Sequence, residues 1–140
     1  MAEKSTDELL KELSGSETFK KYKEENTDSY IKAQLSDMLN GIIEQKGLKK
    51  TDVIRRAEIS EIYGFQIFGG RKLPERGKLL CLLISMGLEF AEVQDVLKKA
   101  GYSPLYVRIP FDCVVIYGIC KGKSVAEINE MLYDYGLETL

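Results

Sequence analysis

The side chains with the clearest capacity for chemistry form one basic stretch in the middle of the chain. Residues 46–78 hold nine lysines and arginines but four acids, a local charge of +5. Residues 1–45 carry −4 and residues 79–140 carry −3, so the net charge of −2 hides this asymmetry. A basic segment between two acidic ones is expected where only the middle of a protein meets a polyanion. A solvated basic face without a partner is the alternative. The nine cations are Lys46, Lys49, Lys50, Arg55, Arg56, Arg71, Lys72, Arg76 and Lys78.

The residue types give little support for a nucleophilic active site or a metal-binding site. The chain has no histidine, so Ser-His and Cys-His activation are impossible and no side chain ordinarily titrates near neutrality. Cys81, Cys113 and Cys120 sit in apolar runs without a CxxC spacing, which predicts packed, reduced thiols instead of zinc ligands. Glycine motifs of the Walker type are absent. We therefore expect no enzyme, no metal site and no cofactor.

Composition and apolar runs indicate an ordinary globular chain. Its 140 residues, 44% hydrophobic and 30% charged, suit one domain with appendages. The longest apolar run, LLCLLISMGL from Leu79, is shorter than the roughly 18–20 residues of a membrane span. The first residues, MAEKSTDELL, are acidic and polar, unlike a secretory signal. We expect a cytoplasmic protein with no membrane partner.

The pattern along the chain is helical nearly throughout. Two short polar helices are predicted over 6–13 and 17–25, capped by Ser5 and Ser16 and separated by a break at Ser14-Gly15. A third, with one apolar face, is predicted over 29–45 from the spacing of Ile31, Leu35, Met38, Leu39, Ile42 and Ile43.

The second half of the chain contains an internal repeat. Helices are predicted over 76–86, 90–99 and 111–120, and from the capping box of Ser124 to Gly136. Shifting by 35 residues aligns Leu79–Leu105 with Val114–Leu140 without gaps, with seven of 27 positions identical. Such helical pairs bury their faces by stacking, so we expect one continuous all-α body.

The basic stretch itself reads as a helix-turn-helix. Over Leu48–Pro74 the sequence LKKTDVIRRAEISEIYGFQIFGGRKLP predicts one helix over 49–57 and a second from the Ser60 cap to Phe68. The turn is Glu58-Ile59, and Gly69-Gly70 ends the second helix. Val53, Ala57, Ile59 and Ile67 are expected to face the core.

This layout resembles the XRE family of bacterial and phage repressor domains. The resemblance covers roughly Ser29–Leu97 and is specific at the Ile59-Ser60 turn, Ile67, Gly70 and Pro74. More narrowly, YGFQIFGGRKLPERGKLL and NEMLYDYGLETL look like a subgroup with a C-terminal helical extension.

Two positions depart from the family pattern. Glu58 stands where the family usually has glycine, at a cost of about 1 kcal/mol for a left-handed residue. The family places a small residue in the first helix of the motif against a branched one in the second. Ile54 and Gly64 exchange these sizes, which predicts a compensated pair and a clash for Gly64→Val.

The expected fold is all-α, with a five-helix repressor-type helix-turn-helix core. An N-terminal helical arm (1–28) precedes the DNA-binding domain (29–105). A C-terminal helical hairpin (106–140), repeating the last two helices of the core, packs on it.

The family's docking mode implies a set of DNA contacts, with residues 60–68 as the recognition helix in the major groove. The base-reading positions are Ser60, Glu61, Ile62, Phe65 and Gln66, with Gly69 also facing the groove. The phosphate-binding positions are Lys49, Lys50, Arg55, Tyr63, Arg71 and Lys72. For Tyr63 an interior role is an equal alternative.

Two functions remain open. The first is sequence-specific binding of double-stranded DNA as a bacterial transcriptional regulator. A homodimer is expected there, because one short helix reads few bases. The second is a protein–protein adaptor on a helix-turn-helix scaffold, favoured because exposed Ile62 and Phe65 beside Glu61 would be unusual for groove reading. The acidic C-terminal hairpins are expected to serve as a surface for dimerisation or for docking a protein partner.

Overall fold

The computed structural model describes residues 5–15 and 19–140, with side chains described for 5–12 and 32–140. This part of the chain is entirely helical, with eight helices and no strand. The helices are α1 (Thr6–Gly15), α2 (Phe19–Lys46), α3 (Lys50–Arg56), α4 (Glu61–Phe68), α5 (Arg76–Ser85), α6 (Phe90–Lys99), α7 (Pro110–Cys120) and α8 (Val125–Asp134). The all-α prediction is therefore confirmed.

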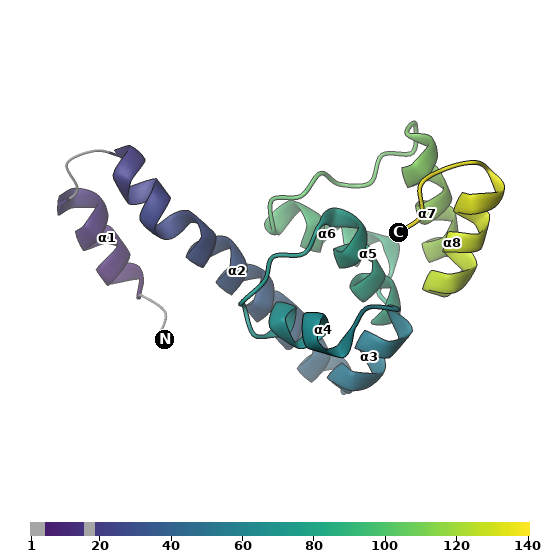
Figure 1. Cartoon of the computed structure of the whole chain (residues 1–140), viewed down its shortest axis with the longest axis horizontal. Helices are drawn as coiled ribbons and strands as arrows, with labels where there is room; N and C mark the ends of the chain where they lie inside the picture. Colours follow the sequence, from purple (N-terminus) through teal and green to yellow (C-terminus); the bar gives the residue numbers. More distant parts are fainter. Residues whose placement is uncertain (1–4, 16–18) are drawn as a thin grey trace.

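The amino-terminal helices differ from the prediction. The helices expected over 17–25 and 29–45 are one continuous helix, α2, because neither glycine nor proline interrupts the chain between residues 19 and 40. The α1 helix includes Ser14 and Gly15, where the break was expected, and ends at Gly15. Ser5 caps α1 as predicted, accepting a hydrogen bond from the Glu8 N–H at 3.2 Å, whereas the predicted Ser16 cap lies outside the described residues. Figure 1 shows α1 and the first half of α2 projecting away from the body formed by the other helices.

The core is centred on α5. Five consecutive residues of this helix, Leu79–Leu83, are buried, because α3 packs on one side of it and α8 on another. The carboxyl half of α2 adds Leu35, Leu39 and Ile43 from its apolar face. In the described part of the chain, no helix has both the length and the apolar character needed to cross a membrane.

The internal repeat is present in three dimensions. Helices α6 and α8 begin and end at residues 35 apart, and α5 contacts α8 while α6 contacts α7. An equivalent side chain anchors the segment after each pair: Gln94 Oε1 accepts the Leu105 N–H, and Asn129 Oδ1 accepts the Leu140 N–H, both at 2.7 Å. Helices of the two related pairs therefore contact each other.

An ion pair with a buried carboxylate joins α5 to α7. Two guanidinium nitrogens of Arg76, in α5, donate to the two carboxylate oxygens of Asp112, in α7, each at 3.0 Å. Asp112 is only 1% exposed, and its carboxylate also accepts the Tyr106 N–H at 2.9 Å. Arg76 donates further to the carbonyls of Ser103 and Pro104 in the linker. This network fixes the linker and α7 against α5.

The cysteine prediction was wrong for two of the three thiols. Cys81 is buried, and this burial raises its pKa to about 11. Cys113 and Cys120 are exposed. The apolar run of α7 suggested burial, but this helix lies at the outer edge of the stack and only part of its surface is covered.

Candidate nucleic-acid interface

The turn between α3 and α4 has a defined backbone geometry. Ala57 ends α3 in a right-handed conformation, and Glu58 then adopts a left-handed one, with φ +60°. Ile59 packs partly against the core. Ser60 caps α4, its hydroxyl oxygen accepting the Tyr63 N–H at 3.2 Å. Glu58 thus takes the conformation usually given to glycine, which sets the direction in which α4 leaves α3.

The crossing of the two helices depends on Gly64. A Cβ added at this residue would lie 2.6 Å from Cγ1 of Ile54 and 2.7 Å from its Cδ1. Both residues are buried, so α4 approaches α3 to a distance that only glycine permits. The predicted exchange of large and small partners is present, and so is the basis for the predicted Gly64→Val clash.

The carboxyl end of α4 is held by two polar residues of α2 that the sequence reasoning missed. The Ser36 hydroxyl donates to the Phe68 carbonyl at 2.6 Å, and the Asn40 amide donates to the same oxygen at 2.8 Å. Together they satisfy a carbonyl left without a partner at the helix end. The available signal was a serine and an asparagine, four residues apart, within an otherwise apolar helix face.

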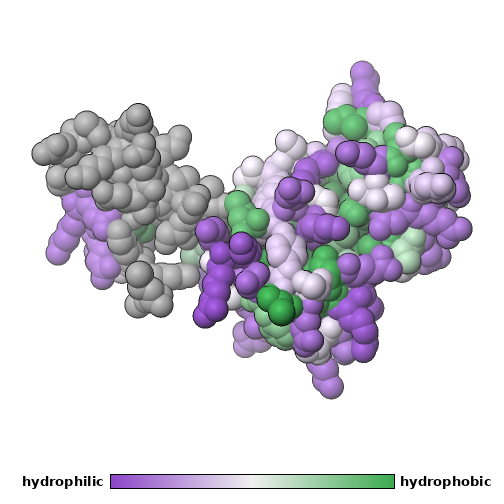
Figure 2. Space-filling view, in the orientation of Figure 1, coloured by the Kyte–Doolittle hydropathy of each residue, from purple (hydrophilic) through white to green (hydrophobic). Residues whose placement is uncertain are grey.

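One face of α4 is open to solvent and slightly hollowed. Its side chains line a cavity of about 650 Å³ whose lining residues are Glu61, Ile62, Phe65, Gln66, Gly69 and Arg71. The structure thus brings together four of the five predicted base-reading residues, and exposed Ser60 lies immediately before them at the cap. Ile62 is 76% exposed and Phe65 is 41% exposed. Figure 2 shows hydrophobic surface over α4 next to hydrophilic side chains.

The predicted phosphate-binding residues fall into two groups. Lys49, Arg71 and Lys72 are exposed, and none of them forms an ion pair within the described part of the chain. The chain after α4 turns back on its last turn, where the N–H groups of Arg71 and Lys72 both donate to the Gln66 carbonyl. The two cations therefore sit at one end of the open face.

The remaining three are engaged within the protein. Arg55 pairs with Asp52 at 3.1 Å, although its own side chain is 78% exposed. The ammonium of Lys50 lies 5.6 Å from the centroid of the Phe68 ring. Tyr63 is half-buried against the core, and this burial, followed by the charge of Glu75, raises its pKa.

Several cations of residues 46–78 form ion pairs or hydrogen bonds within the protein. Arg76 is committed to Asp112, and Arg56 donates to the Ser85 carbonyl at 3.2 Å. Lys46 lies 3.7 Å from a carboxylate oxygen of Glu92. Only some of the nine cations in residues 46–78 are therefore available to an external anion.

The described residues contain no group of three or more acidic or cysteine side chains that could hold a metal ion. Comparison of the chain with models of known protein families, with curated proteins and with solved structures gave no match in any of the three.

Proposed function

We propose that this protein binds duplex DNA through a helix-turn-helix formed by α3 and α4, as a transcriptional regulator similar to the XRE family. In this proposal α4 enters the major groove and its open face reads base edges. Gln66 suits an adenine edge, and Ile62 or Phe65 suits a thymine methyl group. A homodimer would place two such helices on two half-sites.

The main support for the proposal is that the open face of α4 lies next to cations that have no ion-pair partner. The face of α4 ends at Arg71 and Lys72, which have no carboxylate partner among the described residues. Lys49 and Lys50 lie at the start of α3, and Lys50 reaches the Phe68 ring at the carboxyl end of α4. Cations around a projecting helix supply the salt-dependent part of duplex affinity, whereas the helix supplies sequence choice.

The experiment is selection from a randomised duplex library, followed by affinity measurements on the selected duplex at several salt concentrations. We expect an enriched motif and affinity that falls steeply with salt. Replacing Lys50 and Arg71 with alanine should lower the slope of log affinity against log salt by about 2, since about one counterion is released per phosphate contact.

A matched control removes two other cations. Lys98 and Lys99 are exposed on α6, so Lys98→Ala with Lys99→Ala changes the net charge equally without touching α3 or α4. Equal salt slopes for the two double variants would contradict the proposed interface.

A protein-binding adaptor is the second candidate, and one observation favours it. Ile62 and Phe65 present apolar side chains to solvent on α4, and contiguous exposed apolar surface often marks a protein interface. Absence of any enriched motif, with Ile62→Ser abolishing a complex isolated from cell extract, would support this function over DNA binding.

A further inference from the structure

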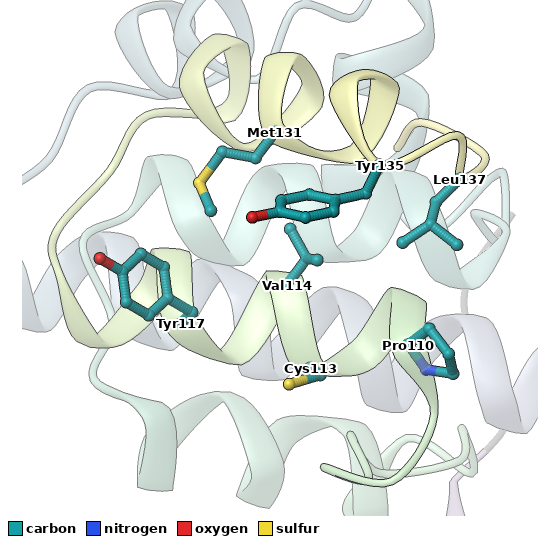
Figure 3. A pocket seen from close by; sticks show the side chains of 7 residues that line it. All are labelled: Pro110, Cys113, Val114, Tyr117, Met131, Tyr135 and Leu137. Atoms are coloured by element: carbon teal, nitrogen blue, oxygen red, sulfur yellow. The ribbon is translucent and has the colours of Figure 1, made fainter.

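A second open surface lies on the outer side of the α7–α8 pair. Figure 3 shows a shallow groove in which Val114 and Tyr135 lie at the centre and Tyr117 stands at one end. Its volume is about 560 Å³, and its lining residues are Pro110, Cys113, Val114, Tyr117, Met131, Tyr135 and Leu137. We call this surface the α7–α8 groove. None of its lining side chains carries a charge.

The internal repeat allows the α7–α8 groove to be compared with the equivalent face of the α5–α6 pair. Shifting the groove residues back by 35 gives the equivalent positions of the α5–α6 pair, and four of those seven are buried: Leu79, Leu82, Val96 and Ala100. None of the seven groove residues is buried. The same face is thus covered by the rest of the chain in the first pair and uncovered in the second.

Apolar exposure is concentrated in residues 106–135, the segment that contains the groove. Of the ten large hydrophobic residues that are exposed in the described part of the chain, six lie between residues 106 and 135. Tyr106, Val107 and Ile109 immediately precede Pro110 at one end of the groove. An apolar surface of this extent is typical of a protein–protein contact.

The charges at the two ends of the groove favour a second copy of the same chain. Lys121 lies 5.8 Å from the centroid of the Tyr117 ring, at one end. Asp134 is exposed at the opposite end of the hairpin, where α8 ends. A two-fold axis through the neutral centre would set Lys121 of one copy towards Asp134 of the other.

We propose that the chain forms a symmetric homodimer through the α7–α8 groove. Each copy covers the face that the first repeat already covers within one chain, and Tyr135 is the central aromatic contact. This association needs no DNA and is separate from the surface of α4.

The test is sedimentation equilibrium without DNA, with two matched tyrosine variants. Tyr135 and Tyr133 are 72% and 76% exposed, but only Tyr135 lines the groove. We expect the wild type to reach twice its 15.9 kDa mass. Tyr135→Glu should raise the dimer dissociation constant at least about 30-fold, as for a central aromatic anchor, whereas Tyr133→Glu should leave it unchanged.

Thiol labelling of the unmutated chain gives a second readout that no folding defect can confuse. Cys113 lines the groove, whereas Cys120, exposed on the same helix, does not. Raising the protein concentration through the dissociation constant should protect Cys113 from a maleimide while Cys120 keeps reacting.

Three results would overturn the dimer: a monomeric wild type at all concentrations, a dimer insensitive to Tyr135→Glu, or equal losses for both tyrosine variants. A monomeric wild type that still binds duplex would overturn the dimer alone. A dimer without duplex affinity would overturn the DNA-binding proposal alone.

Discussion

The α3–α4 and α7–α8 pairs share one backbone design and differ in what they expose. In both, a left-handed residue follows the end of the first helix, and a serine two residues later caps the second; these left-handed residues are Glu58 and Gly122. Ser60 and Ser124 each accept the N–H three residues ahead at 3.2 Å. In both, one glycine lets the helices touch against an isoleucine, Ile54 for Gly64 and Ile128 for Gly118.

The surfaces of the second helices are opposite in character. The open face of α4 ends at two cations, Arg71 and Lys72, whereas α8 carries Glu127, Glu130 and Asp134. The glycine also lies on the second helix in α3–α4 but on the first in α7–α8. The comparison teaches that this turn is a way of crossing two helices. Under the two proposals above, the side chains projecting from the second helix would decide whether the pair binds a polyanion or a protein.

The largest expected effect concerns what attaches the α7–α8 pair to the core. Asp112→Ala would leave Arg76 without its buried partner. Removing one member of a fully buried pair costs about 3–5 kcal/mol, and the loss here should approach the lower end of that range because the Arg76 side chain is 27% exposed. Urea unfolding followed by circular dichroism measures the loss. Arg55→Ala is the control, because the Arg55–Asp52 pair is exposed and should change stability by about 1 kcal/mol or less. Equal losses for the two variants would contradict a special role for Arg76–Asp112.

The next effect concerns the glycine–isoleucine contacts. Gly64→Val should cost about 1–3 kcal/mol or more, because its Cβ would overlap the Ile54 side chain. Gly118→Val should cost a similar amount through Ile128, while leaving duplex affinity intact if α4 alone reads DNA. Both are measured by urea unfolding.

A double variant tests whether Ile54 and Gly64 act as a compensated pair. Ile54→Ala alone should lose stability through a cavity, and combining it with Gly64→Val should restore much of the loss. A double variant that is no more stable than the less stable of the two single variants would show that the pair is not compensated.

A smaller effect concerns the left-handed residue of each turn. Glu58→Gly should raise the free energy of unfolding by up to about 1 kcal/mol, because glycine adopts φ +60° without strain. The greater entropy of glycine in the unfolded chain reduces this gain. Gly122→Glu should lose about 1 kcal/mol for the converse reason. Thermal unfolding of both variants checks this. A loss on Glu58→Gly would mean that the Glu58 side chain stabilises the turn.

The smallest effect is a pH dependence at the start of α8. The Glu127 carboxylate accepts the Ser124 N–H, and this hydrogen bond, with that of the Ser124 side chain, lowers the Glu127 pKa from its ordinary value of 4.5. A lowered folded-state pKa gives stability above pH 4.5 that is lost as pH falls through the folded value. Tyr63 occupies the equivalent position of α4 and gives no such acid dependence.

Carboxyl-carbon NMR titration of Glu127 measures this shift, and amide exchange at pH 6 and pH 3 compares the first turns of the two helices. Selective loss of protection in α8 at pH 3 is expected. A Glu127 titration midpoint at or above 4.5 would contradict the capping box.

Much of the fold was predictable because the helix ends are local events. Serine caps, the capping box at Ser124 and the glycines after the helices act within four residues, so α6 was predicted at its observed bounds. The prediction failed between residues 25 and 29, where no glycine or proline stops α2, and at the thiols of α7. There, helix continuation and partial burial depended on neighbours that a local pattern does not contain.

Sequence alone thus determined the all-α class, the 35-residue repeat and the composition of the α4 face. Periodicity, capping and charge depend on residues that are close together in the chain. Tertiary structure decided which charged side chains and which helix faces remain exposed to solvent. Arg76 is taken up by Asp112, 36 positions away, and Phe68 is held by Ser36 and Asn40 across 32 and 28 positions. The α7–α8 groove is open only because no further element of the described chain covers it. Such outcomes depend on long-range packing, because apolar residues at equivalent positions are buried in the first repeat and left uncovered in the second.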